Sequence, residues 1–404
     1  MANTLKFGGG TWATKEGSTL AYNDENNNFK PLPFTTTRNS IATRVNKEGL
    51  IEVVGNDVPR IDYTDSEDGV LLLENSSTNL QTYSSDLSSV YVPTNITQTS
   101  NYGASPDGSL TSTRVVLANL TDSRSVETLT GTLTNGVVYT FSCYYKGVKG
   151  ESTYMYFLSS AGGTNISKEI IFTGDWQRES ITFTAGSASN YTYIVDVRQG
   201  SSTATDFEVW GAQVEANSFS TSYIPTNGSS MQRAADTASG AGNSQVFNDS
   251  EGVLFADIAA LNNDGTTRRF SISDGSYSNR ITLELDESSN TLKAFIISAN
   301  TTYYSPSKVL SDITNYNKTA IKYKQNDFSL WINGFEFDVD NSGNTPINLS
   351  KMQFADGNGS DAPFRGKTKE IGYYDTALTD EELEYLTSYR SLNELVTELN
   401  LNEL

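Results

Sequence analysis

Apolar and polar residues alternate with a period of two along much of the chain, which predicts half-buried strands of antiparallel sheets. In residues 139–145 the side chains Tyr, Phe, Cys and Tyr alternate with Thr, Ser and Tyr, and residues 191–198 and 281–286 show the same alternation. Clusters of Gly, Asn and Ser separate these runs at roughly 8–12 residues, the spacing expected for a β-sandwich. We therefore predict an all-β protein.

The pattern changes along the chain and predicts five segments. Gly8, Gly9, Gly10, Pro31 and Pro33 interrupt regular elements near the start, so we expect an extended arm that packs on a later module or on a neighbouring subunit. The expected segments are the arm over residues 1–80, a jelly-roll sandwich over 81–226, a linker of small polar residues over 227–250, a second antiparallel sandwich over 251–378, and a short helix with a tail over 379–404.

The sharpest local signal is Asn333-Gly334, because Asn-Gly is the preferred type I′ turn of a two-residue hairpin. A turn at this position puts the flanking apolar residues on one face and leaves Trp331 and Glu336 together on the other. The expected pairs are Ile332 with Phe335, Leu330 with Phe337, and Phe328 with Val339.

A capping box at residues 379–382 (TDEE) predicts the start of the C-terminal helix, with acidic residues at the positive end of its dipole. Leu383 and Leu386 supply the apolar stripe of this helix.

Charge excludes several classes of partner. The chain has 404 residues, with 28 Lys and Arg against 48 Asp and Glu, a formal net charge of −20. Such a surface repels nucleic acid and anionic membranes. No run approaches the roughly 20 apolar residues of a membrane span, so we expect no membrane insertion. The first residues show no signal peptide, so we expect synthesis in a cytoplasm.

Two residue counts restrict the chemistry. There is no histidine, which removes the Ser-His-Asp triad and the commonest zinc ligand. The single cysteine, Cys143, leaves no disulfide within the chain, and its alternation with Phe141 and Tyr145 predicts a buried, inert thiol.

Three sets of residues resemble modules of tailed-bacteriophage tail and head fibres or appendages. The first is residues 34–51 (FTTTRNSIATRVNKEGLI), 59–63 (PRIDY) and 72–80 (LLENSSTNL), which resemble the N-terminal region of such proteins. The second is residues 210–215 (WGAQVE), 219–226 (FSTSYIPT) and 233–236 (RAAD), which resemble the close of a carbohydrate-binding-module-like jelly roll. The third is residues 330–334 (LWING), 366–374 (GKTKEIGYY) and 377–382 (ALTDEE), which resemble a laminin-G or concanavalin-like lectin domain.

The resemblance implies a structural virion protein: a fibre, appendage or capsid decoration protein. Its arm, residues 1–80, would attach to other capsid or tail proteins, and its lectin-like sandwiches would face host-surface glycans. The expected location is the virion surface, and the expected assembly is a homo-oligomer, with a trimer favoured. A dedicated receptor-binding adhesin of the tail and a glycan depolymerase are the alternatives.

The depolymerase alternative lacks a complete carboxylate set. One family of glycoside hydrolases with the concanavalin-like fold carries Glu-x-Asp-x-x-Glu on one strand. Glu284-Leu285-Asp286 begins in this way, but Ser289 stands where the second glutamate would be. Glycoside hydrolysis uses a pair of carboxyl groups, so we expect no catalytic residues and no enzyme.

Aromatic side chains are the candidate sugar-binding residues, because sugars stack on their faces. The candidates in this sequence are Trp331, Tyr144, Tyr154 and Tyr156.

Two loops rich in oxygen ligands are candidate calcium sites, since hard cations prefer carboxylate and carbonyl oxygens. The candidate ligands are Asp338 and Asp340 in one loop and Asp356 and Asp361 in the other. Neither loop has EF-hand spacing, and Asp-Gly and Asn-Gly are also ordinary turn residues, so Ca²⁺ is the one candidate cofactor and an ordinary turn is the alternative.

Overall fold

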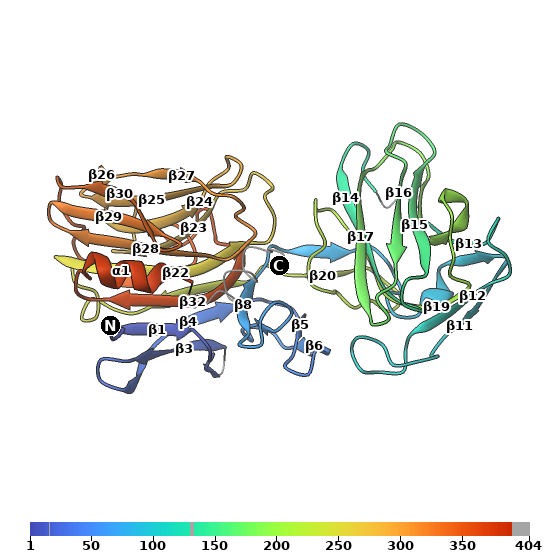
Figure 1. Cartoon of the computed structure of the whole chain (residues 1–404), viewed down its shortest axis with the longest axis horizontal. Coiled ribbons are helices and arrows are strands. Elements are labelled where there is room, and N and C mark those ends of the chain that lie inside the picture. The colour runs from blue at the N-terminus through green and yellow to red at the C-terminus, as the bar shows by residue number, and fades with distance from the viewer. Residues whose placement is uncertain (16, 130–132, 390–404) are drawn as a thin grey trace. The chain divides into compact units, whose positions relative to one another are not determined.

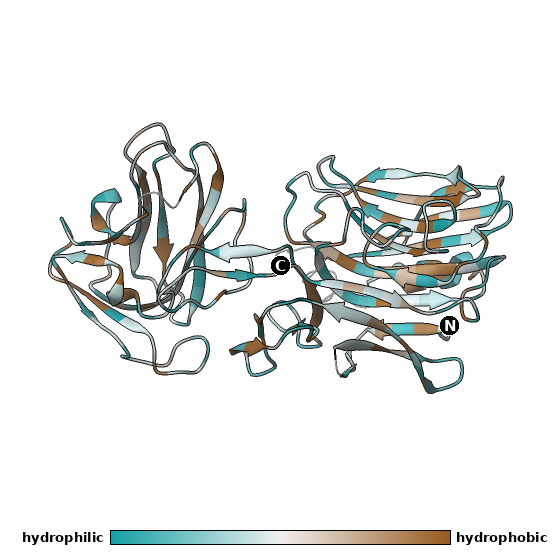
Figure 2. Ribbon diagram, turned by 180° about the vertical axis from the view of Figure 1, so that it is seen from behind, coloured by the Kyte–Doolittle hydropathy of each residue, from teal (hydrophilic) through white to brown (hydrophobic). Residues whose placement is uncertain are grey.

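The computed structural model describes residues 1–15, 17–129 and 133–389 (Figure 1). Strands dominate the described residues, among which there are two short 3₁₀ turns and one α-helix, and this confirms the all-β prediction. Hydrophobic and hydrophilic residues alternate along many of the strands (Figure 2), as expected where one face of a sheet packs on a core and the other does not. No helix in the described ranges has the length and apolarity to cross a membrane.

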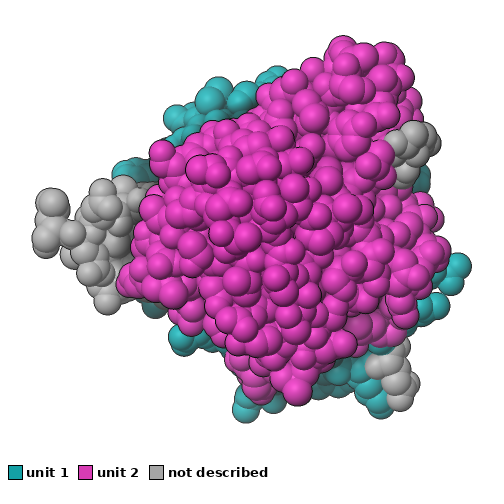
Figure 3. Space-filling model, turned by 90° about the vertical axis from the view of Figure 1, so that its right-hand side faces the viewer, with its two compact units in different colours: residues 1–39, 56–75, 235–404 teal, residues 40–55, 76–234 magenta. Residues whose placement is uncertain are grey.

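The chain forms two compact units (Figure 3). Unit 1 comprises Met1–Asn39, Asn56–Asn75 and Ala235–Leu404, and unit 2 comprises Ser40–Gly55 and Ser76–Ala234. The chain therefore passes from one unit to the other four times, and residues 1–80 contribute to both units.

The elements of unit 1 are β1 (Leu5–Gly8), β2 (Thr14–Lys15), β3 (Ser18–Asn23), β4 (Asn28–Thr37), β7 (Ile61–Asp62), β8 (Val70–Leu73), β21 (Thr237–Ala241), β22 (Glu251–Ala260), β23 (Arg268–Ser273), β24 (Arg280–Leu285), β25 (Thr291–Ser298), β26 (Thr301–Tyr304), β27 (Ser307–Val309), β28 (Asn317–Lys324), β29 (Asp327–Ile332), β30 (Phe335–Asp340), β31 (Lys351–Gln353), β32 (Gly366–Tyr374) and α1 (Asp380–Thr387).

The N-terminal strands are built into unit 1. Strand β1 pairs with β32 and β3, β3 pairs with β4, and β4 pairs with β21, which continues through β31 and β23 to β24 and β25. Phe7 packs 4.5 Å from Phe34, and Phe34 packs 5.0 Å from Phe354, between ring centroids in the core. Leu5, Phe7 and Phe34 of the first 39 residues are thus part of the core of unit 1 itself.

The Asn333–Gly334 hairpin and the C-terminal helix form where the sequence predicts them. Both turn residues have positive φ, 50° and 87°, as a type I′ turn requires. The helix is α1, whose capping box joins Thr379 and Glu382.

The predicted hairpin register holds only next to the turn. Ile332 pairs with Phe335 as expected, but a bulge beyond Trp331 then pairs Leu330 with Asp338 and Ser329 with Val339. A bulge inserts one extra residue into a strand, so every later pair is displaced by one position. Beyond the turn, the predicted pairs of Leu330 with Phe337 and of Phe328 with Val339 are therefore wrong.

The elements of unit 2 are β5 (Ala42–Val45), β6 (Ile51–Val54), β9 (Ser77–Asn79), η1 (Leu87–Ser89), β10 (Val92–Thr94), β11 (Ile96–Thr99), β12 (Thr113–Leu117), β13 (Arg124–Thr128), β14 (Val138–Lys146), β15 (Ser152–Ser159), β16 (Ile166–Ile171), β17 (Gln177–Thr184), β18 (Asn190–Asp196), η2 (Val197–Gln199), β19 (Asp206–Glu215) and β20 (Met231–Arg233).

Unit 2 is a sandwich of two five-stranded sheets, in the orders β10–β13–β18–β15–β16 and β11–β12–β19–β14–β17. Cys143 lies in the shared core between Phe141 and Tyr145, as predicted, and is fully buried. Burial raises the pKa of the Cys143 thiol to about 12, so the thiolate is absent at neutral pH.

The outer face of the β14-containing sheet is covered by the chain's own segments. Trp210 on this face packs 4.5 Å from Tyr223 between ring centroids, and Ile51 of the β5–β6 hairpin joins the same apolar cluster. Even Thr140 and Ser142, which alternate with the core residues of β14, are buried and hydrogen-bonded.

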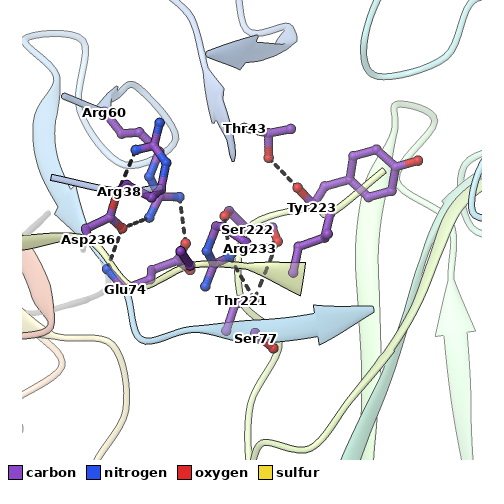
Figure 4. Close-up of polar contacts among 12 residues, drawn as sticks. Arg38, Thr43, Arg60, Glu74, Ser77, Thr221, Ser222, Tyr223, Arg233 and Asp236 are labelled. Carbon is purple, nitrogen blue, oxygen red and sulfur yellow. Dashed lines mark hydrogen bonds and ion pairs between the residues drawn. The ribbon is translucent and has the colours of Figure 1, made fainter. Parts of the chain in front are cut away.

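A buried ion-pair cluster holds together the ends of the segments that make up unit 1 (Figure 4). Arg38 donates to Asp236 at 2.9 Å, and Arg60 donates to Glu74 at 2.6 Å and also to Asp236. The backbone reinforces the cluster, because Glu74 N donates to Asp236 and Asp236 N donates to the Glu74 carbonyl, both at 2.9 Å. All four side chains are almost completely inaccessible.

Each member of this cluster lies within four residues of a point where the chain enters or leaves unit 1. Burial alone would lower the pKa of Arg60, but Glu74 and Asp236 raise it above its ordinary value. Arg60 therefore stays charged, and its position depends on the two carboxylates.

In unit 2, hydrogen bonds connect residues near the ends of its two segments (Figure 4). Thr43 donates to the Tyr223 carbonyl at 2.5 Å, and Arg233 donates to Thr221 at 3.1 Å and to the Ser222 hydroxyl at 2.9 Å. Ser77 donates to Glu215 at 2.6 Å.

Replacing Asp236 by Asn tests the buried cluster. The change leaves Arg38 and Arg60 without a full counter-charge inside the protein, so we expect the free energy of unfolding of unit 1 to fall by about 3–5 kcal/mol. Urea unfolding followed by tryptophan fluorescence measures it. The control is Asp206→Asn, which breaks an exposed pair with Arg114 and should cost less than about 1 kcal/mol. Equal losses in the two variants would contradict this role.

The buried carboxyl of Glu127 in unit 2 makes the stability of the fold depend on pH. Its Oε2 and the Gln81 Oε1 are buried without a hydrogen-bond partner among the described residues. Gln81 donates instead to Tyr91 at 2.9 Å. Burial raises the pKa of Glu127 to about 7, although Gln81 and Tyr91 lower it in part.

We predict that Glu127→Gln stabilises the protein at pH 8 and not at pH 4. The folded carboxyl has a higher pKa than the unfolded one, 4.5, so the folded state holds an extra proton between about 4.5 and 7 and stability falls as the pH rises through this window. The full effect is about 3 kcal/mol above pH 7. Urea unfolding at both pH values measures it, and an equal difference at pH 4 and 8 would refute the explanation.

Candidate functional site

The outer face of the β15-containing sheet of unit 2 carries a group of tyrosines. Strand register places Tyr156 of β15 opposite Tyr193 of β18, and Tyr191 of β18 opposite Leu158 of β15. Tyr154 is two residues from Tyr156 and so lies on the same face. We call Tyr154, Tyr156, Tyr191 and Tyr193 the tyrosine face.

The orientation of this face follows from the core. Thr153, Met155 and Phe157 of β15 point inward and are completely buried, so the tyrosines between them point outward. Tyr154, Tyr156 and Tyr191 are half-buried, whereas Tyr193 is 7% exposed. The rings of Tyr156 and Tyr193 lie 5.3 Å apart with an interplanar angle of 40°.

A charged pair lies beside these rings. Arg198 donates two hydrogen bonds to the Asp196 carboxylate, from Nε at 2.8 Å and from Nη2 at 2.7 Å. Gln199 donates to the same carboxylate at 3.2 Å. Asp196 is fully buried and Arg198 is 39% exposed, so the guanidinium presents its free edge to solvent.

The hydroxyls of Tyr154, Tyr156 and Tyr193 are neutral over the physiological range. Burial raises the pKa of Tyr156 and of Tyr193, Asp196 raises both further, and Arg198 lowers them only in part. Burial, followed by the neighbouring Glu169, raises the pKa of Tyr154. Neutral phenols can both donate and accept hydrogen bonds, so this face combines apolar ring surface with two-way hydrogen bonding.

Gly200 makes room for the Tyr154 ring. A Cβ on Gly200 would lie 2.2 Å from Cζ of Tyr154 and 2.4 Å from its hydroxyl oxygen. The absence of a side chain at position 200 therefore fixes how Tyr154 lies against the end of η2.

The structure brings together two of the four predicted sugar-binding residues, Tyr154 and Tyr156. Tyr144 lies on the other sheet, where it packs edge-on against Trp210 at 5.7 Å with Arg178 over its ring. Trp331 is 6% exposed and packs in unit 1 under helix α1, beside Leu383 and Leu386. Tyr144 and Trp331 therefore serve packing in this structure.

Local partners engage the carboxylates of three of the four predicted calcium ligands, and at Asp338 the backbone carbonyl is engaged. Asp340 accepts hydrogen bonds from the backbone and side chain of Ser342, as in an ordinary turn, and the Asp338 carbonyl accepts from Tyr304. Asp356 pairs with Arg269 at 2.6 Å and with Arg280 at 2.9 Å.

Asp361 accepts a hydrogen bond from the amide of Ala362. Within the described ranges, no group of three or more His, Cys, Asp or Glu residues is arranged to hold a metal ion.

The sequence pattern did not identify four residues of this site: Tyr191, Tyr193, Asp196 and Arg198. Their alternation predicts a strand, but only the pairing of β18 with β15 reveals that Tyr193 lies beside Tyr156. A tyrosine at every second position in both strands, 154 and 156 against 191 and 193, is the signal that could have suggested a common face.

Comparison with known proteins identifies no family. No family model matches the sequence, and no curated protein matches it. Solved structures resemble it in part. The CBM40 of the Ruminococcus gnavus IT-sialidase is 14% identical and aligns 36% of this chain with 86% of its own, at a TM-score of 0.32.

The NanB sialidase of Streptococcus pneumoniae is 16% identical and aligns 37% of this chain with 26% of its own, at a TM-score of 0.32. The CBM22-1-CBM22-2 tandem of Paenibacillus barcinonensis Xyn10C is 9% identical and aligns 76% of this chain with 100% of its own, at a TM-score of 0.28. These TM-scores are too low to transfer a ligand or an activity, so the tyrosine face rests on its own geometry.

Proposed function

We propose that this protein is a non-enzymatic structural component of a tailed-bacteriophage particle that binds host-surface glycans through the tyrosine face of unit 2. The observation that carries the glycan-binding part is the outward pair of Tyr156 and Tyr193 beside the Arg198–Asp196 ion pair.

The chemistry of this face suits a sugar. Pyranose rings present C–H groups on their faces and hydroxyls around their edges, and aromatic rings with polar tips match both. Arg198, held in place by Asp196, adds a fixed donor without needing to be ordered on binding. The neutral phenols of Tyr156 and Tyr193 add groups that accept as well as donate.

The virion assignment rests on the resemblance in residues 34–51, 59–63, 72–80 and 210–236. Four of these residues, Arg38, Arg60, Glu74 and Asp236, form the buried ion-pair cluster, which gives the quoted motifs a common structural role. In this proposal the protein is made in the host cytoplasm and assembles on the virion surface as a homo-oligomer, with a trimer favoured.

Attachment to capsid or tail proteins through residues 1–80 would use the exposed part of that region. Leu5, Phe7 and Phe34 are buried in the core of unit 1, whereas Tyr22 and Phe29, paired across β3 and β4, are 40% and 52% exposed. This hairpin is one of the exposed apolar surfaces of the N-terminal region, which also includes Val53, 58% exposed.

The two alternatives are a dedicated receptor-binding adhesin of the tail and a glycan depolymerase. The adhesin would use the same tyrosine face and differs only in its place on the particle. The depolymerase is disfavoured because Glu284 and Asp286 are engaged by Arg269 and Lys293, and because Ser289 replaces the further carboxylate.

Tyr156→Ala should weaken binding to host-surface polysaccharide by about tenfold or more, because it removes the central ring of the face. Binding of the full chain to an array of host capsule and lipopolysaccharide glycans measures the effect. The control is Tyr102→Ala, which removes an exposed tyrosine elsewhere in unit 2 and should leave binding unchanged. A blank array, or equal losses in both variants, would count against the tyrosine face. Release of reducing ends would favour the depolymerase.

Immunogold labelling of intact particles should place the protein on their surface, on either the head or the tail. Replacing Tyr22 and Phe29 together by Ser should remove it from particles while leaving the purified chain folded, because both side chains are exposed. Absence of the protein from purified particles would overturn the virion assignment without affecting the glycan-binding proposal.

A further inference from the structure

The outer face of the β31–β23–β24–β25 sheet in unit 1 carries a second set of polar side chains in register. Arg269 of β23 pairs with Glu284 of β24, which pairs with Lys293 of β25, so three charged residues form a row across three strands. In the adjacent row, Ser271 pairs with Thr282 and Thr282 pairs with Phe295. The residues between them along each strand, such as Ile272, Leu283 and Ala294, point into the core.

Ion pairs connect this face to a loop. Arg269 contacts Glu284 and lies 2.6 Å from Asp356, and Arg280 lies 2.9 Å from the other oxygen of Asp356. Lys293 lies 2.6 Å from Asp286. Asp361 lies 3.8 Å from Arg269 as a further carboxylate, so each of the three cationic side chains is paired and the set carries no excess of positive charge.

The carboxylates are buried although the face points away from the core. Glu284 and Asp286 are 2% and 8% exposed, whereas Arg269 and Lys293 are 25% and 30% exposed. Burial raises the pKa of Glu284. Buried ion pairs seldom stabilise a fold more than apolar side chains of the same size would, so stability alone does not account for this arrangement.

One polar atom in the middle of the face has no partner. The Thr282 hydroxyl is buried between Arg280 and Glu284 along β24, and it makes no hydrogen bond to any described residue. Its cross-strand neighbour Ser271, by contrast, donates to the Ala355 carbonyl at 2.7 Å. A buried hydroxyl without a partner is unfavourable, and a ligand hydroxyl could satisfy it.

Apolar surface lies next to these groups. Phe295 is half-buried directly beside Thr282, and Tyr277 is 42% exposed with the Arg280 guanidinium over its ring at 5.4 Å. The face therefore combines donors, acceptors and aromatic surface within one patch of sheet.

We propose that this face of unit 1, centred on Arg269, Thr282, Glu284, Lys293 and Phe295, is a second binding site, for an uncharged oligosaccharide. Sugar hydroxyls both donate and accept, which matches alternating guanidinium, hydroxyl, carboxylate and ammonium groups. An anionic ligand is disfavoured, because the cationic groups of the site are already paired with carboxylates and the whole chain carries a net charge of −20. Phe295 would stack against the sugar ring.

The test uses the full chain carrying Tyr156→Ala, so that the tyrosine face does not contribute. Saturation-transfer NMR with laminarihexaose, xylohexaose and maltohexaose measures binding, and a galacturonic acid hexamer is the charged probe. We expect at least one neutral hexasaccharide to bind and the charged hexamer to bind less. No binding by any neutral hexasaccharide, or preference for the charged one, would overturn the proposal.

Thr282→Val separates a binding role from a structural one. Valine has nearly the same shape and removes a hydroxyl that has no partner, so the melting temperature should not fall. Binding should weaken by about threefold or more, the loss expected for one hydrogen bond. A lower melting temperature with unchanged affinity for the oligosaccharide would show that Thr282 has a structural role and would overturn the proposal.

A second comparison uses Lys293→Ala combined with Phe295→Ala, which should weaken binding by about tenfold or more. The matched control is Phe335→Ala, which removes a 76% exposed phenylalanine from β30 of the same unit and should have no effect. Equal losses in both would overturn the site. If Tyr156→Ala leaves glycan binding intact while Thr282→Val abolishes it, only the tyrosine face is refuted.

Discussion

The four-residue ion-pair cluster of Arg38, Arg60, Glu74 and Asp236 is the constraint on which the rest of the structure depends. A chain that passes four times between two units must bring distant segment ends together inside each one. In unit 1 these charges do so from four separate segment ends, with no access to water. A buried charge is strongly unfavourable without its partner, so unit 1 is complete only when all of these segments are in place.

The same constraint explains why the N-terminal residues are part of a sandwich. Arg38 directly follows β4, whose partner β21 begins one residue after Asp236. With both ends fixed, β1, β3 and β4 extend the ladder from β32 to β21, and Phe7 and Phe34 fill the core. The attachment region of the proposed virion protein is thereby restricted to what stays exposed, which includes Tyr22 and Phe29.

Within unit 2, the covering of one sheet decides where a ligand could bind. Ile51 of the β5–β6 hairpin and Tyr223 of the segment before residue 226 pack on Trp210 of the β14-containing sheet. On the opposite sheet Tyr154, Tyr156 and Tyr191 of the tyrosine face stay half-buried, with the Arg198–Asp196 pair beside them. The two sheets have similar aromatic content, so the difference lies in which face the chain itself occupies.

Local patterns in the sequence determined much of the fold. Alternation over residues 139–145 placed Phe141 and Cys143 in the core, Asn333-Gly334 fixed a type I′ turn, and residues 379–382 fixed the start of α1. These features depend on neighbours within a few residues, which a sequence shows directly. The predicted hairpin register is wrong beyond Trp331, because the bulge there has no signature in the local sequence pattern.

The candidate sites were decided by tertiary structure. Sequence alone identified Tyr154 and Tyr156 but ranked them with Tyr144 and Trp331, since it does not show which side of a sheet another segment will cover. Trp331 became buried when α1 packed on it, and Asp356 became an ion-pair partner when its loop met Arg269 and Arg280. Tyr193 joined Tyr156 only through the pairing of β18 with β15. Composition and period settled which residues form strands, and long-range pairing settled which of their faces remain open, because burial of a face depends on segments far away in the chain.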